Sequence, residues 1–396
     1  MNVPKIRFND FYDNISKISI KELGNVITGT TPSTADRSNY GDEYLWASPV
    51  DMGDFKYINN TKTKLSEKGF NKTRCVPKDS ILITCIGSTI GKTGMASKEM
   101  STNQQINTLI PNKNYNSDYL YYCINFNFPR FLNKISFQAV PIISKSEFEK
   151  LEVNITKNIY EQEKIGNMLS LIDKKIELQS KKIEDLKLFK KGLINKELNN
   201  LNDCKSISLN ELGTTYSGLY GKTKEDFENG NCKFINFMSV LKDNIDVSSL
   251  TTVKINPNEK QNKVEKGDLF FMTSSETKEE VALCSTLSYD VKNLYLNSFC
   301  FGYRINNLNL INNEYLNCLL HSPKYRKQIS NLGQGFTRVN ISKNKLLELL
   351  VEVPDMKQQI RIVSINNKIN YKINSEINKL NKLNELKKGL MQNMFV

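Results

Sequence analysis

Short polar loops in this 396-residue chain carry glutamine, threonine, serine, lysine and arginine side chains. An amide can form two hydrogen bonds with adenine, arginine or lysine can do so with guanine, and hydroxyls can bond to either base. These side chains are therefore candidates for contacting base edges, although each loop alone is more typical of an ordinary surface turn. Arg338 is the strongest candidate in the second half, because glycines and an aromatic residue flank it. The candidates are Thr30, Thr31, Ser33, Lys92, Gln104, Gln105, Gln138, Lys222, Lys224, Lys278, Gln334, Thr337 and Arg338.

The net charge of the chain, +13, favours a polyanionic partner, with nucleic acid as the first candidate. Two segments carry much of the basic excess. Residues 157–197 contain 10 Lys or Arg against 7 Asp or Glu, and residues 357–389 contain 8 against 2. These lysines could contact phosphates or an acidic partner, and they are equally typical of the solvated face of a helix.

The residues that most enzymes use for acid–base chemistry are scarce. Histidine is the commonest general acid or base near neutral pH, and the chain has one, His321. Its place just before Pro323 predicts a structural role near a helix end. The chain contains no G-x-S-x-G elbow, no paired-histidine metal motif and no (Asn or Asp)-Pro-Pro-(Tyr or Phe) sequence of an amino-methylating enzyme. A nuclease built on three acidic or lysine ligands stays open, but no pattern indicates an active site.

One segment is close to a phosphate-binding loop without matching it. Gly87-Ser88-Thr89-Ile90-Gly91-Lys92-Thr93 has three residues between its glycines, whereas the phosphate-binding motif needs four. A loop of that length would not wrap a nucleotide phosphate in the same way. This segment therefore argues against nucleotide binding.

The sequence predicts a soluble cytoplasmic protein. No stretch approaches the roughly 20 consecutive apolar residues of a membrane-spanning helix, and the first residues lack the apolar core of a signal peptide. The eight cysteines include no C-x-x-C pair and, with one histidine, form no recognisable zinc site. Scattered cysteines of this kind indicate reduced thiols.

The chain repeats itself at an interval of about 195 residues. Glu22-Leu23-Gly24 recurs at 211–213, and Asp79 and Thr84 match Asp268 and Thr273, all at an offset of 189. Near the end of each copy the offset is 197 and holds without a gap for about 30 residues, as a helix requires, because one inserted residue rotates later side chains by about 100°. The matched positions there are Gln162, Ile165, Ile176 and 190–193 with Gln359, Ile362, Ile373 and 387–390.

Within each copy the sequence pattern changes once, from a mixed strand-and-turn pattern to a helical one. This organisation predicts an α+β protein with an internal pseudo-two-fold repeat. Short β-branched and aromatic runs lie among Gly, Asn, Ser and Pro clusters, as expected for two mixed α/β domains. Each is followed by a helical segment. The expected division is 1–156 and 201–353 for the two mixed domains, and 157–200 and 354–396 for the two helices.

The two helical segments carry apolar residues at spacings of three and four, with no internal proline. Such a pattern predicts long coiled-coil-like helices. Each could pack on its own domain, but two matching seams favour an antiparallel pair that packs together. About 35 residues make a helix roughly 50 Å long, which is about one and a half turns of B-DNA. Two similar basic domains on such a spacer would suit a bipartite double-stranded site.

In their order, these features resemble the specificity subunit of type I restriction–modification systems. The resemblance covers essentially the whole chain. It rests on residues 4–8 and 20–24, on Thr31-Pro32-Ser33, on residues 87–92 and on Asn103-Gln104-Gln105. Residues 353–360 are similar to the family's start of the spacer helix, a proline followed by Glu-Gln; the first copy, 158–162, lacks the proline.

The resemblance implies a chain that is not itself an enzyme. Each target-recognition domain would read one half-site, and the conserved helices would set the spacing and dock two methyltransferase subunits. S-adenosylmethionine would then be bound by those subunits, and ATP with Mg by restriction–translocase subunits, leaving this chain without a cofactor or metal. Adenine methylation would be directed by the chain and performed by its partners.

Two other classes stay open at this point. An enzyme with recognition domains would act as the purified chain alone with a divalent metal or a methyl donor. A non-catalytic coiled-coil adaptor that binds only protein would show no salt-dependent affinity for DNA, whereas phosphate contacts impose a steep negative salt dependence.

Overall fold

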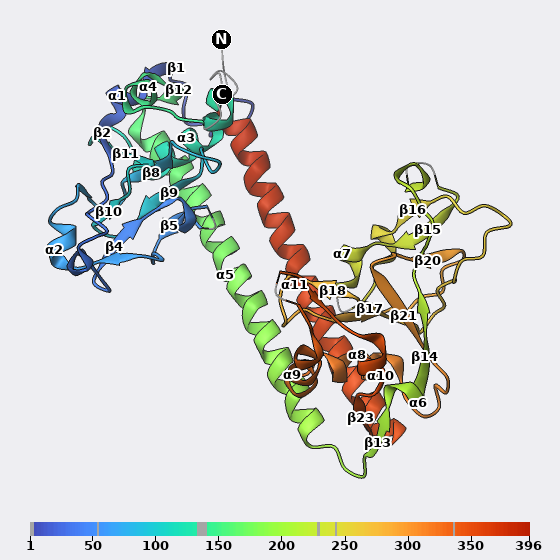
Figure 1. Ribbon diagram of the computed structural model, residues 1–396. Helices are drawn as coiled ribbons and strands as arrows, with labels where there is room; N and C mark the ends of the chain where they lie inside the picture. The colour runs from blue at the N-terminus through green and yellow to red at the C-terminus, as the bar shows by residue number, and fades with distance from the viewer. Residues whose placement is uncertain (1–3, 54, 133–140, 228–229, 242–243, 336) are drawn as a thin grey trace. The chain divides into compact units, whose positions relative to one another are not determined.

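The computed structural model describes residues 4–53, 55–132, 141–227, 230–241, 244–335 and 337–396 (Figure 1). The chain divides into two compact units, and the candidate Gln138 lies outside the described residues. Unit 1 combines Met1–Lys182 with Glu376–Val396, and unit 2 is Ile183–Ser375. Two long helices, α5 (Ile159–Asn199) and α11 (Met356–Met394), each contribute residues to both units.

Unit 1 is built on two five-stranded sheets and a two-stranded ribbon. The ribbon pairs β1 (Ile15–Ser19) with β12 (Glu152–Thr156) in antiparallel register. The first sheet contains, in spatial order, β2 (Gly24–Thr28), β11 (Ile106–Pro111), β8 (Ile81–Thr84), β9 (Thr93–Ala96) and β5 (Tyr57–Ile58). The second contains β3 (Tyr40–Gly41), β6 (Lys64–Leu65), β4 (Tyr44–Ala47), β10 (Met100–Thr102) and β7 (Cys75–Val76).

The core of unit 1 lies between the first sheet, α3 and the helices that follow. All four residues of β8 are buried, as expected for an unbroken run of apolar and β-branched residues covered on both faces. α3 places a run of tyrosines and other apolar side chains against the sheet, where Tyr122 and Phe128 are fully buried. The helices are α1 (Ile20–Leu23), α2 (Glu67–Phe70), α3 (Ser117–Leu132) and α4 (Lys145–Lys150), with 3-10 turns at Arg37–Asn39 and Pro49–Asp51.

Unit 2 repeats this plan with fewer strands. Its main sheet contains β14 (Gly213–Ser217), β21 (Cys300–Ile305), β17 (Leu269–Met272) and β19 (Cys284–Thr286), and its second sheet β16 (Thr251–Val253), β15 (Cys232–Ile235) and β20 (Leu294–Leu296). Two ribbons pair β13 (Lys205–Ser208) with β23 (Leu350–Val353) and β18 (Ser274–Ser275) with β22 (Val339–Asn340). The helices are α6 (Leu209–Leu212), α7 (Phe237–Val240), α8 (Asn313–Leu320), α9 (Pro323–Leu332) and α10 (Lys343–Leu347), with 3-10 turns at Lys224–Phe227 and Val247–Ser249.

The repeated Glu-Leu-Gly motif has the same structural role in both units. The serine before α1 or α6 donates its hydroxyl to the glutamate, with Ser19 2.6 Å from Glu22 and Ser208 2.6 Å from Glu211. This pairing caps the first turn of a short helix. The repeat is therefore confirmed at the level of local hydrogen bonding.

One part of the expected repeat register is wrong. Asp79 and Gly267 occupy equivalent turns with positive φ, 65° and 92°, each two residues before the start of β8 or β17. The offset there is 188 and not 189, so Asp268 does not match Asp79, nor does Thr273 match Thr84. A left-handed turn position accepts glycine or aspartate, so the recurring aspartate was a misleading guide to the register.

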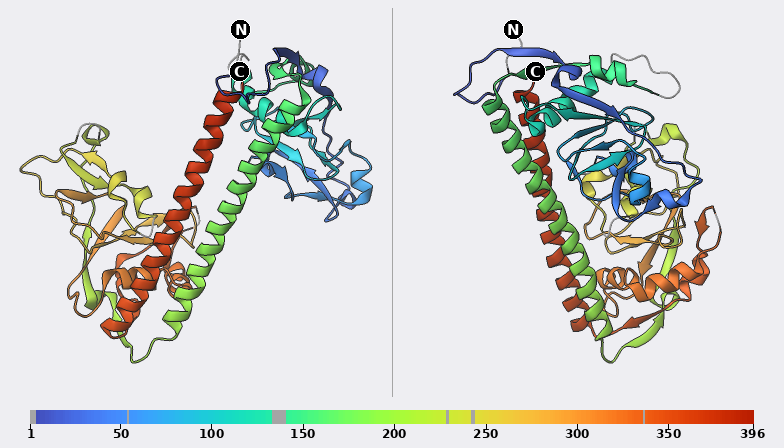
Figure 2. Two further views of the ribbon diagram at one scale, coloured as in Figure 1. Left: turned by 180° about the vertical axis from the view of Figure 1, so that it is seen from behind. Right: turned by 90° about the vertical axis from the view of Figure 1, so that its left-hand side faces the viewer.

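The long helices expected at 157–200 and 354–396 correspond to α5 and α11, with each end within two residues. In unit 1 their segments run antiparallel and are joined by an ion pair of 2.6 Å between Asp173 and Lys387 (Figures 1 and 2). In unit 2 the antiparallel contact is made by Glu197 and Arg361, 3.2 Å apart. The apolar seam also packs on the globular parts, because Ile165 belongs to the core that α3 and the sheet form. Both packing modes that the sequence allowed are therefore present.

Among the described residues, no helix is long and apolar enough to cross a membrane.

Candidate nucleic-acid interface

Three segments of unit 1 meet where β2 ends. We call them loop cluster 1: residues 29–33, residues 71–74 and residues 103–105. The backbone N–H of Thr30 donates to the Thr102 carbonyl at 2.8 Å, which joins the end of β2 to the end of β10. Gly29 allows this approach, because a Cβ atom there would lie 2.2 Å from the Asn103 carbonyl oxygen.

Polar side chains bind the three segments of loop cluster 1 together. Thr31 donates its hydroxyl to Gln104, and the Arg74 guanidinium donates to the Thr28 carbonyl at 3.0 Å. The Arg74 backbone N–H also donates to the Thr30 hydroxyl at 3.0 Å, and the Trp46 indole N–H donates to the Thr30 carbonyl at 3.0 Å. The cluster thus gathers hydroxyl, amide and guanidinium groups, all of which suit base edges.

Unit 2 builds the same arrangement, which we call loop cluster 2: residues 218–222, residues 259–262 and residues 297–299. Gly218 approaches the turn between β20 and β21 so closely that a Cβ atom would lie 2.0 Å from the Asn297 carbonyl oxygen. Asn297 accepts a hydrogen bond from the Phe299 N–H at 2.8 Å, as Asn103 does from the Gln105 N–H at 3.0 Å. The two clusters therefore share a backbone frame.

The structure brings four of the predicted residues of unit 1 together in loop cluster 1: Thr30, Thr31, Gln104 and Gln105. Ser33 is exposed at the end of the same loop, and its carbonyl accepts from Asn39 at 3.0 Å. Lys92 is not part of the cluster. It lines a cavity described below, where a Cβ at Gly53 would lie 3.3 Å from its side chain.

The predicted residues of unit 2 fall into two groups. Lys222 is withdrawn into loop cluster 2, where its ammonium pairs with Glu259 at 2.6 Å and the side chain is 6% exposed. This partner holds the pKa of Glu259 below its usual range. Exposed positions are taken by Lys224, Lys278, Gln334, Thr337 and Arg338.

The loop that carries Gln334, Thr337 and Arg338 lies close to loop cluster 2. Its base is closed by backbone hydrogen bonds between Gln334 and Asn340, at 2.8 and 2.9 Å. β22 at the end of this loop pairs with β18, and Thr273 just before β18 donates its hydroxyl to the Phe299 carbonyl at 2.8 Å. The loop and the β20–β21 turn are therefore neighbours within unit 2.

Arg74 and Asn262 belong to the clusters but were missed by sequence reasoning. Both are exposed and come from segments without an evident motif. The signal that could have found them is the repeat itself, since the corrected offset of 188 pairs position 74 with position 262.

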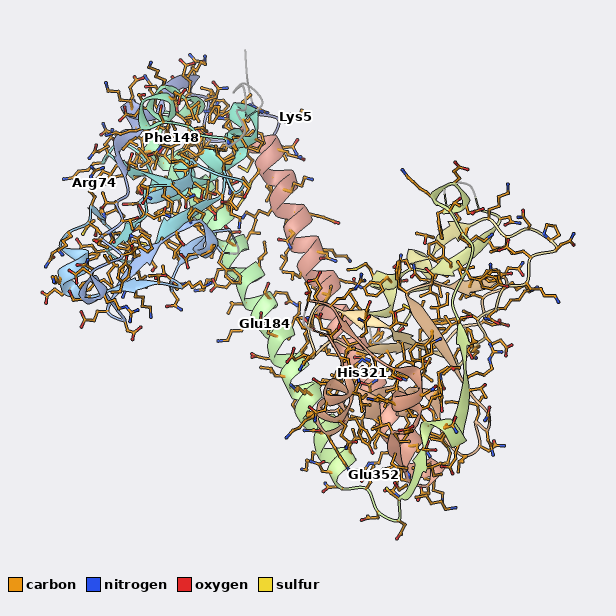
Figure 3. The ribbon with its side chains drawn as sticks, viewed as in Figure 1. Lys5, Arg74, Phe148, Glu184, His321 and Glu352 are labelled. Atoms are coloured by element: carbon orange, nitrogen blue, oxygen red, sulfur yellow. The ribbon has the colours of Figure 1, made fainter. Side chains whose placement is uncertain are left out.

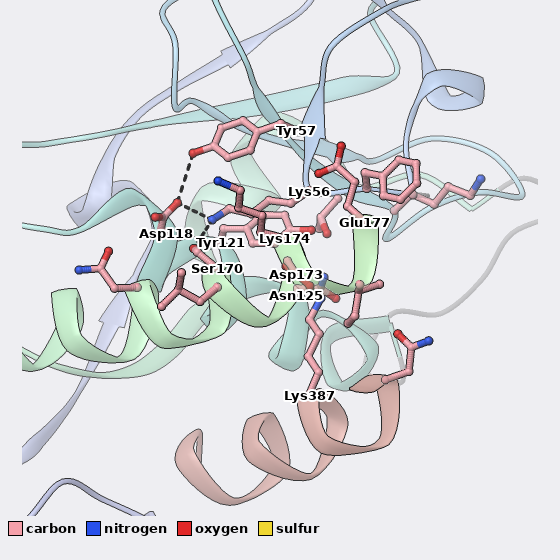
Figure 4. A pocket seen from close by; sticks show the side chains of 18 of the residues that line it. Lys56, Tyr57, Asp118, Tyr121, Asn125, Ser170, Asp173, Lys174, Glu177 and Lys387 are labelled. Atoms are coloured by element: carbon pink, nitrogen blue, oxygen red, sulfur yellow. Dashed lines mark hydrogen bonds and ion pairs between the residues drawn. The ribbon is translucent and has the colours of Figure 1, made fainter. Parts of the chain in front are cut away.

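A second polar assembly lines a cavity of about 970 Å³ in unit 1, between the sheet, α3, α5 and α11 (Figure 4). Lys56, whose side chain is 5% exposed, donates to Asp118 at 2.5 Å and to Ser170 at 2.6 Å. Its ammonium also lies 5.0 Å from the centre of the Tyr122 ring and 5.2 Å from that of Tyr57. Burial lowers the pKa of Lys56, because it disfavours the charged form, while Asp118 opposes that shift.

A second connection to the long helices involves Asp173 and Lys387, which also line this cavity. The Tyr122 hydroxyl donates to Asp173 at 2.6 Å, and Asp173 pairs with Lys387 of α11 at 2.6 Å. Burial, with Asp173 nearby, raises the pKa of Tyr122 well above its ordinary value. These groups are paired with one another, so we interpret this assembly as a junction between the globular part of unit 1 and its helices.

Nothing in the described part of the chain resembles a metal centre, since no group of three or more His, Cys, Asp or Glu side chains is placed to hold an ion. His321 lies inside unit 2 at the end of α8 (Figure 3), and its Nδ1 is 2.8 Å from the Asn317 carbonyl oxygen. The expected structural role near a helix end is confirmed.

Comparison with known proteins gives two matches to one sequence family, described as the type I restriction modification DNA specificity domain. The matches cover residues 12–188 and 202–388, one in each half of the chain.

Individual relatives are specificity subunits of the same kind of system. The MjaIX subunit of Methanocaldococcus jannaschii is 31% identical over 189 residues, which is 45% of this chain and 43% of the relative. The HindI subunit of Haemophilus influenzae is 31% identical over 140 residues, 34% of this chain and 30% of the relative. The chain thus spans less than half the length of these two relatives.

Two solved structures share the fold. The S subunit of a type I restriction–modification system from M. genitalium covers 100% of this chain and 99% of its own, at 19% identity and a TM-score of 0.61. A chain from a study of complex assembly and conformational transition of the type I system covers 97% of this chain and 98% of its own, at 12% identity and a TM-score of 0.58.

Proposed function

Because the chain belongs to the family of type I restriction–modification DNA specificity domains, we propose that it recognises a bipartite sequence in double-stranded DNA. Each unit reads one half of the site. One observation carries this proposal: the two family matches fall on two units that present equivalent loop clusters. In each cluster a glycine, Gly29 or Gly218, allows the close approach of the backbone.

The loop clusters and their neighbours supply the contacts to DNA. In the first half-site, hydroxyl and amide groups of Thr30, Thr31, Ser33, Gln104 and Gln105 face the base edges. In the second, Gln334, Thr337 and Arg338 do so. Lys224 and Lys278 are exposed and suit phosphate contacts, which strengthen binding without selecting a sequence. Lys222 serves the fold of loop cluster 2, since its charge is already paired.

The chain selects the site, and partner subunits perform the chemistry. Two methyltransferase subunits bind S-adenosylmethionine and methylate adenine in each half-site. Restriction–translocase subunits bind ATP and Mg. The chain itself then needs no cofactor, and it works in the cytoplasm, where its DNA and partners are.

The long helices set the spacing of the half-sites and dock the methyltransferase subunits. Large apolar side chains on both helices are exposed, including Leu171 at 63% and Leu178 at 59% on α5 in unit 1 and Tyr371 at 79% on α11 in unit 2. Exposed apolar groups at intervals along a helix are expected where a partner helix covers them. This exposure supports a docking role.

The test is methylome mapping of a host that carries the chain with its methyltransferase, against a host in which only the chain is deleted. Loss of one bipartite adenine-methylation motif on deletion supports the proposal and supplies both half-sites. An unchanged methylome, together with DNA affinity of the assembled complex that does not fall as salt rises, would favour the protein-binding adaptor.

A further inference from the structure

One backbone carbonyl in each unit is capped by a side chain of different chemistry. Thr28 is the last residue of β2, and Ser217 is the last residue of β14. Each strand pairs antiparallel with the strand of its sheet that comes last in the sequence, β2 with β11 and β14 with β21. The Thr28 carbonyl accepts from the Arg74 guanidinium Nη1 at 3.0 Å. The Ser217 carbonyl accepts from the Asn262 amide Nδ2 at 3.0 Å. Arg74 and Asn262 therefore occupy one equivalent position.

The frame around this position is constant, but the side chains on it are not. Gly29 and Gly218 make the same close approach to the asparagine turns at Asn103 and Asn297. On that frame, Gln104 and Gln105 of unit 1 are replaced by serine and phenylalanine in unit 2. Two domains that recognise different DNA sequences require this combination of a fixed backbone and variable side chains.

Each capping side chain is held in place and still has polar atoms to offer. Arg74 is exposed at the surface of unit 1 (Figure 3), and none of the described residues pairs with its Nε and Nη2 groups. Asn262 is exposed too, and within the described chain its Oδ1 has no hydrogen-bond donor. A guanidinium anchored through one nitrogen loses less side-chain entropy when its free edge binds.

The chemistry of the free atoms differs between the two units. The Nε–Nη2 edge of an arginine donates two parallel hydrogen bonds, which match O6 and N7 of guanine in the major groove. An amide oxygen accepts from an exocyclic amino group, which adenine and cytosine present there. The free atoms at the two positions thus suit different bases.

We propose that Arg74 and Asn262 are equivalent specificity-determining residues, Arg74 selecting a guanine in the first half-site and Asn262 an adenine or cytosine in the second. This inference rests on the proposed function, because it requires that each unit reads one half-site. It adds the base class that one residue of each unit selects.

The experiment uses the full chain assembled with its methyltransferase subunits and a DNA library randomised across both half-sites. Methylated molecules are sequenced for the unaltered chain and for Arg74→Ala and Asn262→Ala. We expect Arg74→Ala to lower the preference for guanine at one position of the first half-site by roughly 10-fold or more, with the second half-site unchanged. Asn262→Ala should relax one position of the second half-site and leave the first unchanged.

Matched controls come from the opposite ends of the same sheets. Lys113 and Asn309 are exposed and follow β11 and β21, whereas the clusters precede these strands. Lys113→Ala and Asn309→Ala should leave every position of both half-sites unchanged. In each test variant, the half-site that still reads normally reports that the chain is folded and assembled.

The possible outcomes distinguish a failure of this inference from a failure of the proposed function. If the unaltered chain directs no sequence-dependent methylation, the proposed function fails. If it does, and both variants keep every base preference, the inference is overturned while the function stands. A variant that loses methylation evenly over all sequences would show that Arg74 or Asn262 only holds its loop, which also overturns the inference.

Discussion

Gln162 and Gln359 make the same hydrogen bonds in the two units. Each amide oxygen accepts from the backbone N–H of an asparagine, Asn116 in unit 1 and Asn312 in unit 2, both at 2.8 Å. Each amide nitrogen donates to a backbone carbonyl just before the long helix, at 2.8 and 2.9 Å. Both side chains are fully buried. One repeated glutamine thus joins the start of each long helix to the start of α3 or α8.

Replacing this glutamine should destabilise its unit. We expect Gln162→Ala or Gln359→Ala to lower the free energy of unfolding by about 2–4 kcal/mol, because each change leaves buried backbone groups without partners. Denaturant unfolding of each variant measures the loss. Gln392→Ala, at an exposed position of α11, is the control and should change the free energy by less than about 0.5 kcal/mol. Equal effects at the buried and exposed positions would contradict the assigned role.

Lys56→Met should weaken the junction of unit 1. The change keeps the buried stem but removes the ammonium that pairs with Asp118 and Ser170. We expect a loss of about 1–3 kcal/mol in the free energy of unfolding, since Asp118 loses its partner in a largely buried site. Adding Asp118→Asn should recover part of that loss. Lys92→Met, on the exposed rim of the same cavity, should have little effect, and a loss as large as that of Lys56→Met would count against the junction.

Lys222 and Lys224 should respond in opposite ways, although they are two residues apart. Lys224→Ala removes an exposed charge, and we expect the salt dependence of DNA affinity to fall by about one unit of slope. Lys222→Ala breaks the pair with Glu259, so we expect lower stability of unit 2. Affinity measured over a salt series, beside thermal unfolding, separates the two effects. A thermally unaltered Lys222→Ala with a reduced slope would show that Lys222 contacts phosphate.

The cysteines should divide by reactivity. Burial raises the pKa of the Cys85, Cys123 and Cys300 thiols to about 12, so thiolate is scarce below that pH and alkylation of the native protein should be slow. Cys75, Cys204 and Cys232 are half-buried and should be labelled first. Mass spectrometry after a short iodoacetamide pulse at pH 8, with and without denaturant, tests the order. Rapid labelling of Cys123 in the native protein would contradict this burial.

The length of α5 and α11 should set the interval between the half-sites. Seven residues inserted into both helices lengthen each by about 10.5 Å, which corresponds to about 3 base pairs of DNA. We expect the preferred gap between half-sites to grow by that amount, as methylome mapping would reveal. An unchanged gap in a protein that still methylates would refute the ruler.

Sequence reasoning worked best where structure is set by local periodicity. Apolar spacing located α5 and α11 to within two residues, because every turn of a helix repeats the same signal. Sequence reasoning named Thr30, Thr31 and Gln104 as candidates on separate loops, and only the fold brings those loops together. Their contact with DNA stays a prediction. The four-part division of the chain stays a prediction.

Long-range pairing explains what the sequence did not reveal. In the sequence Lys222 and Lys224 look alike, since both are lysines in one polar loop. Only the fold brings Glu259 next to Lys222. Lys92 belongs to a polar loop, yet it lies at the cavity beside α5 and not in loop cluster 1. Arg74 and Asn262 belong to no motif, because each is positioned by a hydrogen bond to the end of a strand about 45 residues earlier in the chain.

Unit 2 is one continuous stretch of chain, whereas unit 1 takes its last piece from Glu376–Val396. That piece supplies Met394 and Phe395 to the unit 1 core, with the Phe395 ring centre 5.5 Å from that of Tyr119. The unit 1 core therefore forms only when two stretches that are separated by the whole of unit 2 in the sequence meet. Closing the core of unit 1 therefore costs more loop-closure entropy than closing the core of unit 2.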